Sequence, residues 1–126
     1  MIKDEYKQNG FYSPLVLFSL EQAKIYRNYL EEVENKIGPL HYFAKTYTMM
    51  RWVYEIATNK ILLDFVEDLI GQNILLYNAT FIIKEAMTKT HVSWHQDLTY
   101  WGFDDNEKQV SAWIALSNAD ETSGCM

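Results

Sequence analysis

Apolar and polar residues in the first half of the chain follow the period of an α-helix. After Ser19, apolar residues recur at helical spacing: Leu20, Ala23, Tyr26, Leu30, Val33 and Ile37. Ser19 and Gln22 match a capping box at the start of a helix, and Gly38-Pro39 is a stop signal. We therefore predict a helix from Ser19 to Gly38, with its charged face in solvent.

Two shorter segments also have a helical pattern. One is "MMRWVYEIA", residues 49–57, and the other is "KILLDFVEDLIG", residues 60–71, with Asn59 or Thr58 as its cap and Gly71 as its end. The buried face of the second segment is expected to hold Ile61, Leu62, Phe65, Val66, Leu69 and Ile70. Residues 1–72 are therefore predicted to be mainly helical.

From residue 74 onward the pattern changes to one typical of strands. The segments "ILLYNATFIIK", "HVSWHQDLTYW" and "QVSAWIALSNA" are rich in β-branched and aromatic residues, and "FDDNEK" and "DETSG" are turn-like. Short strands that follow a helical front, with no helix between them, favour a β-sandwich or jelly roll over a doubly wound sheet. We predict a single α+β domain over residues 1–126, in which residues 73–126 supply the first strands.

Composition narrows the class of protein. The 126 residues are 48% apolar, which suits one globular domain, and the net charge of −6 argues against nucleic acid or an anionic membrane as partner. Cys125 is the single cysteine, so an intramolecular disulfide is impossible; this fits a cytoplasmic protein. No apolar run approaches the roughly 18 residues of a membrane span. With no signal peptide, we interpret the glycosylation pattern Asn78-Ala79-Thr80 as a chance match.

The segment "SWHQDLTYWG" holds the candidate chemistry. On a strand, His95 and Asp97 would project from the same face, with Gln96 on the other. Imidazole and carboxylate together suit a borderline divalent metal, and one further histidine would complete the facial triad of non-haem Fe(II) oxygenases. The aromatic residues around them would form a water-poor wall: Trp94, Tyr100 and Trp101. The pair alone is equally compatible with a surface His–Asp hydrogen bond, and the aromatics with a buried sheet face.

Two segments together carry a family resemblance. "VSWHQDLTYWG" followed by "VSAWIALSNADETSGCM" resembles the phytanoyl-CoA dioxygenase family, and "NGFYSPL" and "FIIKEA" extend the likeness back to about Tyr6. The resemblance implies a double-stranded β-helix, a cupin-like jelly roll, with the helical N-terminal part packed on it. It also implies an enzyme that uses Fe(II), 2-oxoglutarate and O₂ to hydroxylate an unactivated C–H bond of a small organic or acyl substrate.

The resemblance assigns roles to individual residues. His95 and Asp97 match the first two iron ligands of the family, and Gln96 lies inside the motif beside the co-substrate. Related halogenases replace the carboxylate ligand with a small residue, so the presence of Asp97 favours hydroxylation over halogenation.

Three more residues match positions near 2-oxoglutarate. Trp113 corresponds to a tryptophan that lines the co-substrate pocket, Tyr77 to a residue against the co-substrate, and Lys45 to a lysine that reaches its carboxylate. Without the resemblance, Trp113 and Tyr77 would be interpreted as core aromatics and Lys45 as a solvated lysine.

The third iron ligand has no candidate in this sequence. On a continuous strand His91 would lie about 13 Å from His95, and His41 follows the Gly38-Pro39 helix stop. We therefore expect an N-terminal portion of an oxygenase, with the distal histidine and an arginine supplied by a C-terminal half or another chain. The alternative is a truncated, non-catalytic scaffold or subunit completed by another chain. A zinc or manganese hydrolase is less favoured, because it also needs three or four protein ligands.

Overall fold

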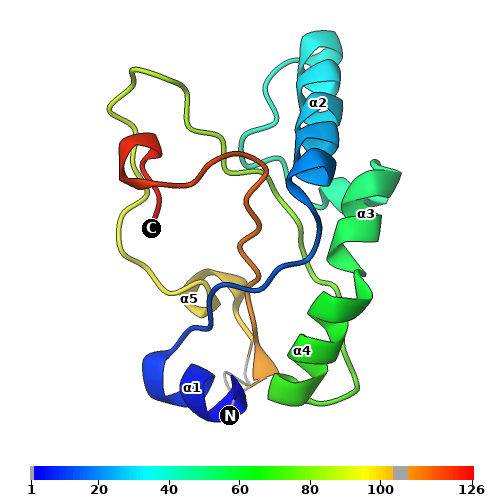
Figure 1. Cartoon of the computed structure of the whole chain (residues 1–126), viewed down its shortest axis with the longest axis vertical. Coiled ribbons are helices and arrows are strands. Elements are labelled where there is room, and N and C mark those ends of the chain that lie inside the picture. The colour runs from blue at the N-terminus through cyan, green and yellow to red at the C-terminus, as the bar shows by residue number, and fades with distance from the viewer. Residues whose placement is uncertain (1, 104–107) are drawn as a thin grey trace.

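The computed structural model describes residues 2–103 and 108–126. Its helices are α1 (Ile2–Asn9), α2 (Leu20–Ile37), α3 (Arg51–Ala57), α4 (Lys60–Ile70) and α5 (Leu98–Trp101), with 3₁₀ turns η1 (Thr46–Thr48) and η3 (Glu121–Ser123). Figure 1 shows α2, α3 and α4 in a column along one side of the molecule. None of the described helices is long and apolar enough to cross a membrane.

The three predicted helices are confirmed. Ser19 caps α2 by accepting a hydrogen bond from the Gln22 backbone N–H at 3.2 Å, and α2 ends at Gly38. The segment 49–57 contains α3. Asn59 caps α4 by accepting from two backbone N–H groups, at 2.9 and 3.4 Å, and α4 ends at Gly71. The N-terminal helix α1 was not predicted, and it has no buried residue.

A small core lies where the segment after α2 meets α3. Leu40, Met50 and Val53 are buried, and Leu40 is only 1% exposed. The residues packed against this core come from α2, η1, α3 and the segment 79–83: Leu30, Val33, Tyr47, Trp52, Ala79, Phe81 and Ile83. The predicted apolar face of α4 is less buried than expected, because only Leu62 is buried and Ile61 is 49% exposed.

Residues 40–48 are held to residues 77–83 by polar contacts. Tyr42 N–H donates to the Phe81 carbonyl at 2.9 Å, beside an isolated parallel bridge between His41 and Phe81. His41 Nδ1 accepts from the Ile83 N–H at 2.9 Å. His41 therefore connects two segments that are far apart in the sequence.

The predicted double-stranded β-helix, or jelly roll, is wrong for the residues that the structure describes. They form helices, turns and irregular segments, with one isolated bridge and no strand. Along 74–77 burial alternates, with Ile74 and Leu76 half-buried and Leu75 and Tyr77 exposed. The sequence pattern predicts this alternation correctly. A strand also needs a second strand beside it to accept and donate its backbone hydrogen bonds, and the pattern does not show whether one is present.

The predicted strand 91–101 is replaced at its end by α5. Backbone N–H groups of Thr99 and Tyr100 donate to the carbonyls of Gln96 and Asp97, at 3.1 and 3.0 Å, so the chain turns here. The predicted turn "DETSG" is confirmed as η3, which Asp120 caps. The predicted turn "FDDNEK" falls largely on residues 104–107, which lie outside the described residues.

Replacing Asn59 with alanine should destabilise α4. The variant loses the side-chain acceptor for two N–H groups at the helix start, which typically costs about 1 kcal/mol of unfolding free energy. Urea unfolding followed by circular dichroism measures this change. Asn28→Ala is the matched control, because Asn28 lies inside α2 and alanine is the better helix former there. Equal losses in both variants would contradict the capping role of Asn59.

Candidate metal-binding site

His95 and Asp97 lie at the entry to α5. Asp97 precedes the helix and already has helical backbone angles, φ −54° and ψ −42°. The His95 Nε2 atom lies 3.1 Å from Asp97 Oδ1. The two side chains therefore meet because the chain turns into a helix at Asp97, and not because they share the face of a strand.

Both ring nitrogens of His95 face hydrogen-bond acceptors. Nδ1 lies 2.7 Å from the Ser93 carbonyl oxygen and Nε2 faces the Asp97 carboxylate. Both nitrogens can donate only when the ring is the imidazolium cation. The hydrogen bond to the Ser93 carbonyl is the largest influence on His95 and raises its pKa above the ordinary value. Desolvation lowers the pKa by less than Ser93 raises it, and the hydrogen bond and charge of Asp97 add two smaller upward effects.

The second carboxylate oxygen of Asp97 is also engaged. The Ser111 hydroxyl donates a hydrogen bond to Asp97 Oδ2, which ties the segment after residue 108 to the pair. Sequence reasoning missed Ser111. The only available signal was its place two residues before Trp113 in "SAW", which says nothing about its partner.

The spacing of the pair fits two ligands of one metal ion. Donor atoms about 2.1 Å from an ion and at right angles to each other lie about 3 Å apart. The His95 Nε2 to Asp97 Oδ1 distance of 3.1 Å agrees with this value. Within the described ranges no group of three or more His, Cys, Asp or Glu side chains is placed to hold a metal.

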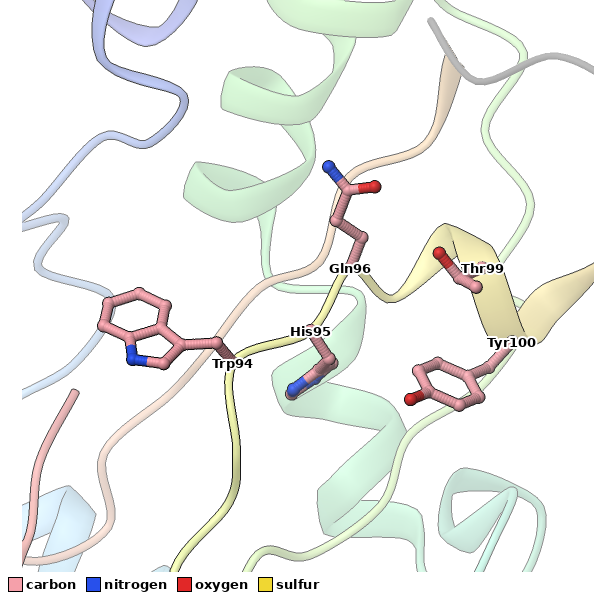
Figure 2. Close-up of a pocket in the computed structure, with 5 residues that line it drawn as sticks. All are labelled: Trp94, His95, Gln96, Thr99 and Tyr100. Atoms are coloured by element: carbon pink, nitrogen blue, oxygen red, sulfur yellow. The ribbon is translucent and has the colours of Figure 1, made fainter.

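An open hollow adjoins His95. It has a volume of about 420 Å³ and is lined by Trp94, His95, Gln96, Thr99 and Tyr100. In Figure 2, His95 lies between Trp94 and Tyr100, and Gln96 is directed away from it. The Trp94 side chain is fully exposed and Tyr100 is 75% exposed. Trp94 and Tyr100 flank the histidine but face solvent, and Trp101 does not line the hollow, so the water-poor wall expected from the sequence is not formed.

Lys45 and Tyr77, both expected near the co-substrate, lie close to each other. Lys45 Nζ is 6.0 Å from the centre of the Tyr77 ring. Tyr77 in turn makes edge-on contacts with Trp101 and Phe103, with ring centres 4.9 and 4.8 Å apart. Trp101 belongs to α5, so this short helix has His95 and Asp97 at its start and the Tyr77 contact at its end.

Trp113 is the remaining sequence candidate. Its side chain is 49% exposed, and it follows the Ser111 that donates to Asp97. The chain segment 111–113 therefore connects the His95–Asp97 pair with Trp113.

A histidine and a carboxylate at ligand spacing, beside an aromatic hollow, define a candidate site for a divalent metal. The family model described as phytanoyl-CoA dioxygenase (PhyH) matches residues 16–126. The chain belongs to the phytanoyl-CoA dioxygenase family, as the resemblance of "VSWHQDLTYWG" predicted. This membership implies an oxygenase of the Fe(II)- and 2-oxoglutarate-dependent type. No match was found among curated proteins or among solved structures.

The pKa of His95 should respond to its two acceptors. NMR titration of the ring protons should give a pKa above the ordinary 6.5 in the wild type, and a lower pKa in Asp97→Asn. The value should stay raised in part, because the Ser93 carbonyl remains. Since the pKa is raised on folding, the stabilisation is complete below about pH 6.5 and is lost as the pH rises through the folded-state pKa. An unchanged pKa in Asp97→Asn would contradict the pairing.

Proposed function

We propose that this protein is a dioxygenase that uses Fe(II) and 2-oxoglutarate to hydroxylate an unactivated C–H bond of a small organic or acyl substrate. The observation that carries the proposal is the His95 Nε2 to Asp97 Oδ1 spacing of 3.1 Å in a chain of this family. Bound Fe(II) would supply O₂ activation, coupled to oxidative decarboxylation of 2-oxoglutarate to succinate and CO₂.

In this proposal His95 and Asp97 hold the metal, and their hydrogen-bond partners orient them. His95 would bind the metal through Nε2, while the Ser93 carbonyl accepts a hydrogen bond from Nδ1–H and fixes the orientation of the ring. Ser111 donates to Asp97 Oδ2 and leaves Oδ1 for the metal. Both ligands would thus be presented in a defined orientation.

The co-substrate would lie among the remaining sequence candidates. Lys45 would supply a positive charge for a 2-oxoglutarate carboxylate. The nearby Tyr77 ring would help to hold the Lys45 ammonium group in place. Gln96 and Trp113 complete the proposed set. The three residues Lys45, Tyr77 and Trp101 connect this region to the end of α5, whose start carries Asp97.

The substrate would enter the hollow beside His95. Its volume of about 420 Å³ is within the range of small-molecule pockets. Trp94 and Tyr100 offer exposed apolar faces there, which suit the aliphatic or aromatic part of a substrate that carries an unactivated C–H bond. We propose that a histidine and an arginine from polypeptide outside the described residues complete the metal and co-substrate sites.

Turnover of 2-oxoglutarate tests the proposal. The protein, together with the polypeptide that supplies the further histidine and arginine, is incubated with Fe(II), ascorbate and 2-oxoglutarate in air, and succinate is measured by mass spectrometry. We expect succinate from the wild type and from His91→Ala, and none above background from His95→Ala. Equal succinate from wild type and His95→Ala would refute the assignment of His95.

A second candidate is a non-catalytic scaffold or subunit that another chain completes. The supporting observation is the exposed surface of 10209 Å², whereas a compact monomer of 14.9 kDa exposes about 7,000 Å². The excess, about 3,200 Å², is comparable with the area that obligate interfaces bury. Sedimentation analysis together with anaerobic Fe(II) titration separates the candidates: a stable monomer or assembly that takes up no iron favours the scaffold.

A further inference from the structure

The sequence Asn78-Ala79-Thr80, which matches a glycosylation pattern, lies next to Tyr77 and takes part in a contact with Lys45. The Asn78 side-chain oxygen Oδ1 accepts a hydrogen bond from the Lys45 backbone N–H at 2.7 Å. The two residues are 33 positions apart, so this bond joins separate parts of the chain. The neighbouring carbonyl of Ala79 accepts from both the N–H and the hydroxyl of Thr46, at 3.1 and 2.9 Å.

Lys45 has a backbone conformation that a lysine rarely adopts. Its φ of 56° and ψ of 36° lie in the left-handed region, where the side chain crowds the backbone. A residue stays in such a conformation only when its surroundings hold it there. Two sets of hydrogen bonds hold the backbone of Lys45. Its N–H donates to the Asn78 side chain, and its carbonyl accepts from the N–H and the hydroxyl of Thr48, at 2.9 and 2.8 Å.

The backbone conformation of Lys45 sets the direction in which its side chain leaves the chain, and so which surroundings the ammonium group can reach. With this conformation the ammonium lies 6.0 Å from the centre of the Tyr77 ring, and Tyr77 directly precedes Asn78. One short segment, residues 77–79, therefore supplies both the ring beneath the ammonium and the acceptors that hold the lysine backbone.

We propose that Asn78 is a positioning residue that holds Lys45 in its left-handed conformation and so directs the ammonium group to the Tyr77 ring. This rests on the proposed function in one respect, the role of Lys45 in binding 2-oxoglutarate. The geometric part of the proposal is independent of that role.

Two readouts test the proposal and separate it from the proposed function. The first is the NMR shift of the Lys45 Hε protons, which the Tyr77 ring current displaces. The second is the dissociation constant of 2-oxoglutarate, measured anaerobically with Fe(II) on the whole chain. Asn78→Ala should return the Lys45 shift toward that of a free lysine and weaken 2-oxoglutarate binding about tenfold, since a misdirected ammonium loses a charged hydrogen bond.

Three further variants separate the loss of the hydrogen-bond acceptor from a loss of folding. Asn78→Asp retains an acceptor oxygen and should keep the wild-type Lys45 shift. Asn78→Leu has nearly the same shape without an acceptor and should reproduce the loss if Asn78→Ala does not fold. Asn73→Ala, an exposed asparagine on the same segment, should change neither readout.

The outcomes are distinct. An unchanged Lys45 shift in both Asn78→Ala and Asn78→Leu overturns the positioning role. A lost shift with tenfold weaker 2-oxoglutarate binding supports it in full. A lost shift in a protein whose wild type binds no 2-oxoglutarate supports the positioning of Lys45 and counts against the proposed function instead.

Discussion

Replacing Asp97 with alanine is expected to weaken Fe(II) binding by about 100-fold or more. The substitution removes one of the two proposed metal ligands, and it leaves His95 with a single hydrogen-bond acceptor, at Nδ1. Loss of a partner that only orients a ligand typically costs 10–100-fold in metal affinity, so loss of a ligand should cost at least as much. Anaerobic Fe(II) titration of wild type and variant measures the ratio of dissociation constants.

A graded series makes this prediction specific. Ser111→Ala keeps the carboxylate but removes the donor to Asp97 Oδ2, so Fe(II) affinity should fall by about 10-fold, less than in Asp97→Ala. Ser117→Ala, an exposed serine in the same segment, should leave the affinity unchanged. If Asp97→Ala binds Fe(II) as tightly as Ser117→Ala, Asp97 is not a ligand.

Leu40→Ala should produce the largest loss of stability, about 2–5 kcal/mol of unfolding free energy. Leu40 is 1% exposed and lies in the core with Met50 and Val53, so truncation removes buried methyl groups and leaves a cavity. Because the described core is small, few other contacts can compensate. Urea unfolding of wild type and variant, with the denaturant slope compared between them, measures the change.

Leu75→Ala is the matched control for the core prediction. It removes the same atoms from a side chain that is 83% exposed, so the change in unfolding free energy should stay within about 0.5 kcal/mol. A loss at Leu75 as large as that at Leu40 would contradict the exposed position of Leu75.

The helices could be predicted from the sequence because their signals are local. Ser19 and Asn59 mark the starts of α2 and α4, and Gly38 and Gly71 mark their ends. The strands could not be predicted in the same way. Alternating residues such as Leu75 and Leu76 do differ in exposure, but pairing depends on which chain lies alongside, and that information is not local.

The sequence singled out His95 and Asp97 as a pair, but it did not predict the geometry in which their side chains meet. The side chains of His95 and Asp97 do meet, but they meet because the chain turns into α5. The aromatic residues of "LTYW" led to the prediction of a strand at this position. The contacts of Ser111 with Asp97 and of Asn78 with Lys45 span 14 and 33 residues, so no local pattern could reveal them. The assignment of the chain to its family came from the motif and not from the predicted fold.

The most direct test of the account is to ask which histidine binds Fe(II). The ring N–H of a coordinated imidazole gives a strongly shifted proton signal in the NMR spectrum of the Fe(II)-loaded protein, and the chain has three histidines. The account predicts that this signal is present in wild type, His41→Ala and His91→Ala, and absent in His95→Ala. A shifted signal that persists in His95→Ala, or that is lost with His41 or His91, would contradict it.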